Sequence, residues 1–311
     1  MSLPPRVAFL GTPDCAVPVL RALAAAVPVR AVFCNPDKPA GRGRQLQAPP
    51  VKAAAEALGL AVHQPASWKA PETRALWESL GVELAVVVAY GHILPRWLLD
   101  SLPLGAWNLH FSILPRWRGA APVNHAILAG DAETGVALMR LTPGMDEGPV
   151  LAQTRRPILF TDTAPDLLGA LAQDGAALLR DHLPAILDGT ATPREQEGEP
   201  TLAPKLNRGM ALLDPRAPAL ELHRRVRALQ PWPGTEITLE GAPLKVCGVG
   251  TLRPAAATSG TLHWDREGCW LACGDGQEME LTLLQRPGKP VQRALQALQA
   301  WGGKGARTLL G

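Results

Sequence analysis

In the first half of the chain, short apolar runs alternate with longer segments in which apolar residues recur every three or four positions. Runs of the first kind are typical of strands buried on both faces of a sheet, and segments of the second kind of amphipathic helices. Strands are predicted at residues 7–10, 29–33, 61–63, 84–89 and 107–109. Helices are predicted around residues 19–23 and at 51–58, 122–128 and 164–187. This order predicts a doubly wound α/β domain with a mostly parallel sheet, in which ligands bind beyond the carboxyl ends of the strands.

The pattern changes after residue 188. Residues 189–200 are polar and rich in Pro and Gly, as expected of a segment that links two domains. A helix is predicted at 219–229, and five short strands follow at residues 235–239, 244–249, 260–264, 269–273 and 278–284. This spacing predicts a small antiparallel β-barrel, and an OB-like fold is the commonest such barrel that binds nucleic acid. We therefore expect a first domain at residues 1–188, a linker at 189–206 and a barrel domain at 207–311.

Length and composition are those of a globular protein with two domains. The chain has 311 residues, 47% of them hydrophobic, and lacks an uninterrupted apolar run of about 18 residues that would predict a membrane span. Its first residues lack the apolar region and cleavage site of a secretory signal, so we expect a cytoplasmic protein. The five cysteines are scattered, and the nearest two, Cys269 and Cys273, have the spacing of neither a zinc site nor a redox pair. We expect no metal site.

The small net charge of +3 conceals an asymmetry. Residues 203–311 contain 14 Lys and Arg against 9 Asp and Glu, a net charge of +5, and the rest of the chain contains 17 against 19, a net charge of −2. A basic second part indicates a polyanionic partner, such as a nucleic acid, although an ordinary solvated surface would give the same count.

The strand at 107–109 carries the residues with the clearest chemistry. Successive side chains of a strand point to opposite faces, so Asn108 and His110 project from one side where the strand leaves its sheet. Asp146 lies in a glycine-flanked turn that can bring its carboxylate back to the imidazole. Together they offer a base, a group that orients it and a neutral donor for an oxyanion. No Ser or Cys stands in an obvious nucleophilic position, which indicates direct transfer between two bound substrates.

The run at 84–89 ends at the same edge of the predicted sheet. Ala89, Tyr90 and Gly91 follow this strand, so we expect them to line the ligand site together with the residues after His110. An alternative stays open, in which His110 is a hydrogen-bonded core residue and Asp146 a turn former.

Several stretches of the chain resemble the methionyl-tRNA formyltransferase family. An Asn-x-His motif with a downstream Asp resembles the wider superfamily that uses formyltetrahydrofolate. Three features narrow the resemblance to the tRNA enzyme. They are the run Pro-Arg-Trp-Arg-Gly-Ala-Ala-Pro at 115–122, the Arg- and Gly-rich loop at 35–44 and the motif Pro231-Trp232-Pro233. The remaining matches are Phe9-Leu10-Gly11-Thr12-Pro13, Val87-Val88-Ala89-Tyr90-Gly91 and the stretch from Gly130 to Val136.

The resemblance implies a Rossmann-like formyltransferase catalytic domain followed by a tRNA-binding barrel. It implies transfer of the formyl group of 10-formyltetrahydrofolate to the α-amine of methionine on initiator methionyl-tRNA, a step of translation initiation. The catalytic set by motif position is Asn108, His110 and Asp146. One active site on one chain needs no second copy, so we expect a monomer.

The resemblance also assigns residues to the two substrates. The folate-binding segment is Ser112, Ile113, Leu114 and Pro115, with Ile113 where the family often has Leu. The loop from Pro36 to Gln45, which we expect to be mobile and exposed, contains the basic residues Lys38, Arg42 and Arg44. In the family such a loop reaches the acceptor stem of the tRNA. Lys205 is a further tRNA-binding residue, in a segment Lys-Leu-Asn-Arg-Gly that departs from the usual Lys-Leu-Ser-Lys-Glu.

Three other functions stay open. A formyltransferase acting on an amino sugar or a nucleotide amine would share Asn108 and His110 but would not need a basic barrel. A nicotinamide-dependent oxidoreductase is disfavoured, because Gly11-Thr12-Pro13-Asp14 replaces the G-x-G-x-x-G motif after the first strand. A catalytically silent RNA-binding protein would leave the Asn108, His110 and Asp146 set unexplained.

Two aromatic positions can each be interpreted as structural or as part of a binding surface. Trp232 is either packed at a domain junction or stacked on a base, and Trp117 with Arg118 either walls the acceptor-end channel or forms a structural stack.

Overall fold

The computed structural model describes residues 4–40, 45–299, 302 and 304–309, and these form two compact units. The first unit takes the described residues up to Gly119, with Glu133–Arg156 and Leu168–Leu202. The second takes Ala120–Ala132, Pro157–Leu167 and the described residues from Ala203 onwards. The second unit thus includes two segments that the sequence pattern placed in the first domain.

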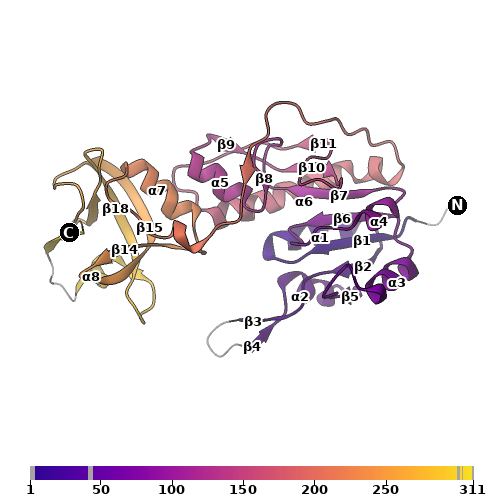
Figure 1. Ribbon diagram of the computed structural model, residues 1–311, viewed down its shortest axis with the longest axis horizontal. Helices are drawn as coiled ribbons and strands as arrows, with labels where there is room; N and C mark the ends of the chain where they lie inside the picture. The colour runs from indigo at the N-terminus through magenta and orange to yellow at the C-terminus, as the bar shows by residue number, and fades with distance from the viewer. Residues whose placement is uncertain (1–3, 41–44, 300–301, 303, 310–311) are drawn as a thin grey trace. The chain divides into compact units, whose positions relative to one another are not determined.

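The first unit is built on a mostly parallel sheet of seven strands (Figure 1). In spatial order its strands are β11 (Val150–Gln153), β10 (Ala137–Arg140), β7 (Ala106–His110), β6 (Leu84–Val88), β1 (Val7–Gly11), β2 (Val29–Phe33) and β5 (Val62–His63). The neighbouring strands β7, β6, β1, β2 and β5 pair in parallel, and β10 and β11 extend the sheet as antiparallel neighbours. The chain proceeds from β1 towards β2 and then returns to β6 on the other side of β1. This reversal is the point at which doubly wound sheets bind ligands.

The helices of this unit follow the apolar periodicity of the sequence. They are η1 (Asp14–Ala16), α1 (Val17–Ala26), α2 (Pro50–Ala57), α3 (Pro71–Leu80), α4 (Arg96–Asp100) and the greater part of α6 (Ala164–Leu187). Pro50 and Pro71 open α2 and α3, where the fixed φ of proline and its missing N–H suit the first helical turn. The prediction of a helix at 164–187 is confirmed. Within the described ranges, the structure contains no helix both long and apolar enough to span a membrane.

Polar contacts join the carboxyl ends of the central strands. Thr12 follows β1, Asn35 lies just beyond β2 and Tyr90 lies just beyond β6. The Thr12 hydroxyl and the Asn35 amide both donate to the carbonyl oxygen of Tyr90, each at 3.3 Å. The Asn35 backbone N–H donates in turn to the Thr12 hydroxyl at 3.3 Å. Three strand ends are therefore fixed to one another at the edge where the site lies.

The loop predicted at Pro36–Gln45 is, in its described part, the base of a hairpin. Strands β3 (Lys38–Ala40) and β4 (Gln45–Gln47) pair in antiparallel register. Asp37 anchors this base, because its carboxylate accepts hydrogen bonds from Lys52 at 2.8 Å and from Gln64 at 2.7 Å. These bonds hold the pKa of Asp37 below its ordinary value. The structure thus has two short paired strands where a loop was predicted; Pro36, Lys38 and Pro39 are exposed as expected, and the mobility of the segment stays a prediction.

Small elements complete the connections of the chain. They are β8 (Arg118–Gly119), β9 (Glu133–Thr134), β12 (Arg156–Pro157) and β13 (Leu202–Ala203).

The second unit contains a curled antiparallel sheet (Figure 1). Its strands run in the order β14 (Thr235–Leu239), β15 (Ala242–Pro254), β18 (Gln277–Gln285), β17 (Cys269–Ala272), β16 (Thr261–Trp264) and β20 (Gly305–Thr308), with β19 (Gln292–Arg293) paired to β18. The helices are α5 (Pro122–Ala129), η2 (Arg208–Met210), α7 (Ala219–Ala228) and α8 (Ala294–Leu298). The predicted fold class is confirmed, with seven strands in place of five.

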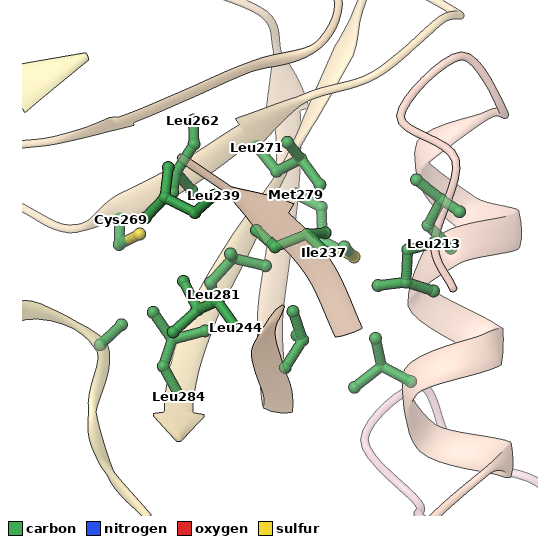
Figure 2. Packing of buried hydrophobic residues seen from close by; sticks show 14 of the residues in the cluster. Leu213, Ile237, Leu239, Leu244, Leu262, Cys269, Leu271, Met279, Leu281 and Leu284 are labelled. Carbon is green, nitrogen blue, oxygen red and sulfur yellow. The ribbon is translucent and has the colours of Figure 1, made fainter. Parts of the chain in front are cut away.

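Alternate side chains of these strands build the core of the second unit. Leu239, Leu244 and Leu284 project together with Met279 and Leu281 into one apolar cluster (Figure 2). The cluster also takes residues from α7 and α8. Trp232, in contrast, is 51% exposed, so much of its ring stays on the surface.

Helix α5 belongs to the second unit because of specific contacts with α7. The Asn124 side-chain amide donates to the carbonyl oxygen of Ala228 at 2.6 Å. Ala228 ends α7, and the last carbonyl groups of a helix lack partners within the helix. The Asn124 amide therefore caps α7 from outside.

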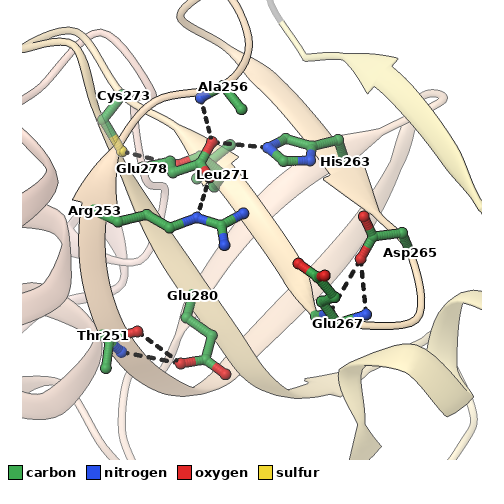
Figure 3. Close-up of polar contacts among 11 residues, drawn as sticks. Thr251, Arg253, Ala256, His263, Asp265, Glu267, Leu271, Cys273, Glu278 and Glu280 are labelled. Atoms are coloured by element: carbon green, nitrogen blue, oxygen red, sulfur yellow. Dashed lines mark hydrogen bonds and ion pairs between the residues drawn. The ribbon is translucent and has the colours of Figure 1, made fainter.

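One carboxylate is fully buried in the curled sheet. Glu278 is 0% exposed, and its oxygens accept hydrogen bonds from Arg253 at 2.6 Å, His263 at 2.8 Å and the N–H of Ala256 at 3.0 Å (Figure 3). Arg253 also lies 3.5 Å from the ring centre of Trp270. Burial raises the pKa of Glu278, but the three hydrogen bonds outweigh it and hold the pKa below the ordinary 4.5.

We predict that Glu278→Gln lowers the free energy of unfolding at pH 7 by about 1–3 kcal/mol, because an amide cannot accept all three hydrogen bonds. A lowered pKa stabilises the fold above the unfolded value of 4.5, and this contribution is lost as pH falls through the folded value. The difference between wild type and variant should therefore shrink from pH 6 towards pH 3. Urea unfolding at several pH values measures it, with the exposed Glu267→Gln as a control that leaves stability unchanged. A constant difference across this range would contradict the prediction.

Candidate active site

Strand β7 places two polar side chains on one face of the sheet. Asn108 and His110 alternate with Leu109, whose side chain lies on the other face against Gly175 of α6. Asn108 is 9% exposed and His110 is 6% exposed. Among the described residues, the Asn108 side-chain amide has no hydrogen-bond partner. The role of Asn108 as an oxyanion donor stays a prediction.

The loop between β10 and β11 folds back to bring Asp146 to His110. It leaves β10 beside the start of β7, where the N–H of Leu141 donates to the carbonyl of Ala106 at 2.7 Å. Asp146 Oδ2 nevertheless lies 3.6 Å from His110 Nδ1, at the other end of β7. The same oxygen accepts the N–H of Gly119 at 2.9 Å. The expected meeting of imidazole and carboxylate is present in the structure.

The base of this loop is tightly closed. A Cβ atom added at Gly148 would lie 1.9 Å from the carbonyl oxygen of Arg140, so only glycine fits there. Gly148 therefore allows the two ends of the loop to pack closely.

The tautomer of His110 follows from its other contact. His110 Nε2 lies 2.8 Å from the carbonyl oxygen of Trp117. A carbonyl oxygen only accepts, so Nε2 carries a hydrogen and donates it. Nδ1 is then the ring nitrogen that can accept a proton, and it faces Asp146.

Left-handed backbone concentrates at this edge of the sheet. Of the four non-glycine residues with positive φ in the described chain, three are Ala89 (φ 46°), Trp117 (φ 66°) and Asp146 (φ 52°). Each such residue costs on the order of 1–3 kcal/mol and persists only where its surroundings hold it. Trp117 presents its carbonyl to His110, and Asp146 presents its carboxylate to the same ring. The strain thus accompanies both contacts of the imidazole.

The predicted folate segment forms a turn that is closed by a hydrogen bond within it. Ser112 is fully buried, and its hydroxyl donates to the carbonyl of Arg116 at 2.6 Å. Leu114 is buried against Ala137 and Met139. Ile113 and Pro115 are partly exposed. Two of the four side chains therefore shape the turn, and the other two are accessible.

The segment after β6 divides in the same way. Ala89 and Gly91 are exposed, whereas the Tyr90 side chain is 2% exposed and its hydroxyl accepts the indole N–H of Trp68 at 3.1 Å. Burial raises the pKa of Tyr90 to about 12. A ligand at this edge would meet Ala89 and Gly91 but not the Tyr90 ring.

The structure describes two of the four residues predicted to bind tRNA. Lys38 is exposed on β3, in the first unit, and Lys205 is exposed in the second unit. Arg42 and Arg44 lie outside the described residues.

The sequence analysis missed the contribution of the segment after α6. Residues 189–206 were expected to be a linker, and one of them, Arg194, exchanges backbone hydrogen bonds with Val150 at 2.7 and 2.8 Å. The Gln196 side chain donates to the carbonyls of Asp146 and Gly148, each at 2.8 Å. Its oxygen accepts from the Arg118 guanidinium at 2.7 and 3.0 Å. Polar, proline-rich composition carries no signal for such contacts.

The pairing of Trp117 also differs from expectation. Arg116, not Arg118, lies over the Trp117 ring, at 4.3 Å from its centre. Arg118 instead binds Gln196, as described above.

Burial raises the pKa of Cys15, Cys269 and Cys273 to about 12 each, so these thiols stay protonated and unreactive. In the parts of the chain that the structure describes, no group of three His, Cys, Asp or Glu side chains could hold a metal ion.

Comparison with known proteins identifies related chains along nearly the whole length. A model of the formyl transferase family matches residues 5–183, and one of the formyl transferase C-terminal domain matches residues 205–301. The chain is 46% identical to a methionyl-tRNA formyltransferase of Halorhodospira halophila over 297 residues, which cover 94% of this chain and 95% of that protein. It is 44% identical to a methionyl-tRNA formyltransferase of Cereibacter sphaeroides over 289 residues, 93% of this chain and 94% of that one.

Solved structures share the fold at much lower identity. The N-formyltransferase of Helicobacter canadensis, solved with folinic acid and dTDP-3-aminofucose, superposes with a TM-score of 0.68 at 18% identity, covering 89% of this chain and 98% of that one. A likeness at this identity supports the architecture of the chain and not its substrate.

Proposed function

Because this chain belongs to the methionyl-tRNA formyltransferase family, we propose that it formylates the α-amine of methionine on initiator methionyl-tRNA. The formyl donor is 10-formyltetrahydrofolate, and the product serves translation initiation. The observation that carries this proposal is the meeting of His110 and Asp146 beside Asn108 in a chain whose relatives at 44–46% identity share this activity by name. One chain can supply all three residues, and we expect a monomer.

The reaction joins the amine to the formyl carbon and breaks the bond from that carbon to N10 of the folate. One proton leaves the amine, and one reaches the departing nitrogen. The carbonyl oxygen becomes an oxyanion on the way, and the Asn108 amide is the group that donates to it. Holding the two substrates in register removes an entropic barrier that can reach about 7–11 kcal/mol.

The proton from the amine passes to the pair formed by His110 and Asp146. Since Nε2 already carries a hydrogen, a proton gained at Nδ1 makes an imidazolium whose charge faces the Asp146 carboxylate. That arrangement stabilises the protonated ring when the amine is attacking. Ala89, Gly91, Ile113 and Pro115 are the accessible parts of the predicted folate segments, and we assign the donor to them.

The direct test is formylation of methionyl-tRNA. Purified protein with 10-formyltetrahydrofolate should form formylmethionine on initiator methionyl-tRNA and much less on elongator methionyl-tRNA or free methionine. Bound folate without product on tRNA, together with formylation of an amino sugar nucleotide, would move the acceptor to another amine and overturn the proposal.

We expect Asn108→Ala to lower kcat about 100–1000-fold, because loss of one oxyanion donor typically has this cost. His110→Ala and Asp146→Ala should lower kcat about as strongly, since they remove the proton acceptor and the group that stabilises it. All three variants should keep the circular dichroism spectrum of the wild type. A folded His110→Ala variant with full kcat would exclude this mechanism.

The acceptor tRNA binds through its phosphates. Lys38, Arg42, Arg44 and Lys205 are the basic residues to which we assign these contacts. We predict that Arg42→Ala raises KM for tRNA, leaves KM for the folate unchanged and lowers the slope of log K against log salt by about 1. Arg21→Ala, an exposed arginine of α1, is the matched control and should behave as wild type. An altered folate KM with unchanged tRNA dependence would count against this assignment.

A further inference from the structure

The Gln196 side chain connects three parts of the first unit that are distant in sequence. Its amide nitrogen donates to the carbonyl oxygens of Asp146 and Gly148, and its amide oxygen accepts from Nε and Nη2 of Arg118. A guanidinium only donates and a carbonyl only accepts, so the orientation of the amide is fixed by its partners. The side chain uses both of its N–H groups and its oxygen.

Two of the connected parts hold the candidate base. Asp146 is the residue that faces His110, and its backbone is left-handed, with φ of 52°. Arg118 directly precedes Gly119, whose N–H donates to the Asp146 carboxylate at 2.9 Å. Gln196 therefore binds the backbone of Asp146 on one side and the neighbour of its carboxylate partner on the other.

The Asp146 loop needs such support. It turns back along β7 over the length of the strand, and its base is closed by the approach of Gly148 to Arg140. The carbonyls of Asp146 and Gly148 both accept hydrogen bonds from the Gln196 side chain. Without the two N–H donors, Asp146 would lose the contacts that favour its left-handed backbone over an unstrained one.

Attachment of the segment itself does not depend on this side chain. Arg194 and Val150 already exchange two backbone hydrogen bonds, and Thr201 binds Pro115 and Arg118 through its backbone. The Gln196 side-chain amide is therefore not needed to attach the segment, and its hydrogen bonds serve the Asp146 loop.

We propose that Gln196 is a positioning residue for catalysis, which holds Asp146 against His110 from the segment that follows α6. This inference rests on the proposed formyl transfer. Gln196 touches neither substrate; it acts through the conformation of the Asp146 loop. Its removal should lower kcat and leave the binding of both substrates nearly unchanged.

The test compares Gln196→Leu with wild type in steady-state formylation. Leu keeps the approximate size of Gln and lacks both donor and acceptor. We expect kcat to fall about 10–100-fold with KM for folate and tRNA within about threefold, as for a misplaced catalytic group. Gln196→Glu should fall as far, because a carboxylate still accepts from Arg118 but repels the two carbonyls. Glu195→Ala, an exposed neighbour, is the control and should match wild type.

Hydrogen exchange provides a readout that does not depend on turnover. The Gly119 amide and the peptide covering 143–150 should exchange faster in Gln196→Leu than in wild type or Glu195→Ala, while strands β1 and β6 keep their protection. If amide protection falls throughout the Gln196→Leu protein, Gln196→Met is compared with wild type instead, because its more flexible side chain packs more easily.

The outcomes are distinct for the two proposals. A kcat within twofold of wild type, or a loss of kcat without faster exchange at 143–150, overturns the role of Gln196. A wild-type protein that formylates no methionyl-tRNA overturns the proposed function, and exchange at 143–150 then still decides whether Gln196 holds the loop.

Discussion

The site depends on bringing one carboxylate to one imidazole. His110 lies at the end of a buried strand, and Asp146 comes from a loop that starts at the opposite end of that strand. A carboxylate that is only 18% exposed loses much of its hydration, and this cost must be offset by donors. The Gly119 N–H supplies one, and the imidazole supplies another when it is protonated. The positive φ values of Trp117 and Asp146 are the conformational cost of aiming both groups at one ring.

The sheet provides the fixed frame for that loop. Parallel pairing of β1, β6 and β7 brings their carboxyl ends to one edge, and the bonds among Thr12, Asn35 and Tyr90 hold the ends of β1, β2 and β6 together. Leu109 packs on the other face of β7 against α6, so the faces of the strand cannot exchange. Burial of Leu109 on one face of β7 therefore fixes the side chains of Asn108 and His110 on the opposite face.

Sequence reasoning found what is periodic or local. The strands at 29–33 and 235–239 and the helix at 164–187 have the predicted bounds, because their apolar spacing is strong. The same reasoning found Asn108 and His110 on one strand face. It did not find strands β10 and β11, which are short, or Gln196, whose partners lie 48 to 78 residues away. It placed Tyr90 in the ligand site from strand topology, but could not tell that its ring turns inward to Trp68. Long-range polar contacts leave no periodic trace in a single sequence.

Two acidic residues of this chain differ in how completely they are buried and hydrogen-bonded. Glu278 accepts three hydrogen bonds, is completely buried and is held ionised by fixed donors. Asp146 accepts one short hydrogen bond from the described residues, stays partly exposed and has its second contact with an imidazole at 3.6 Å. A carboxylate whose donors are all fixed gains little from a new positive charge nearby. In the proposed mechanism, a carboxylate with unused acceptor capacity is stabilised when His110 takes a proton, so the incomplete hydrogen bonding of Asp146 would let it stabilise a transient imidazolium. Donors to its backbone, as from Gln196, can hold such a residue in place without using up that capacity.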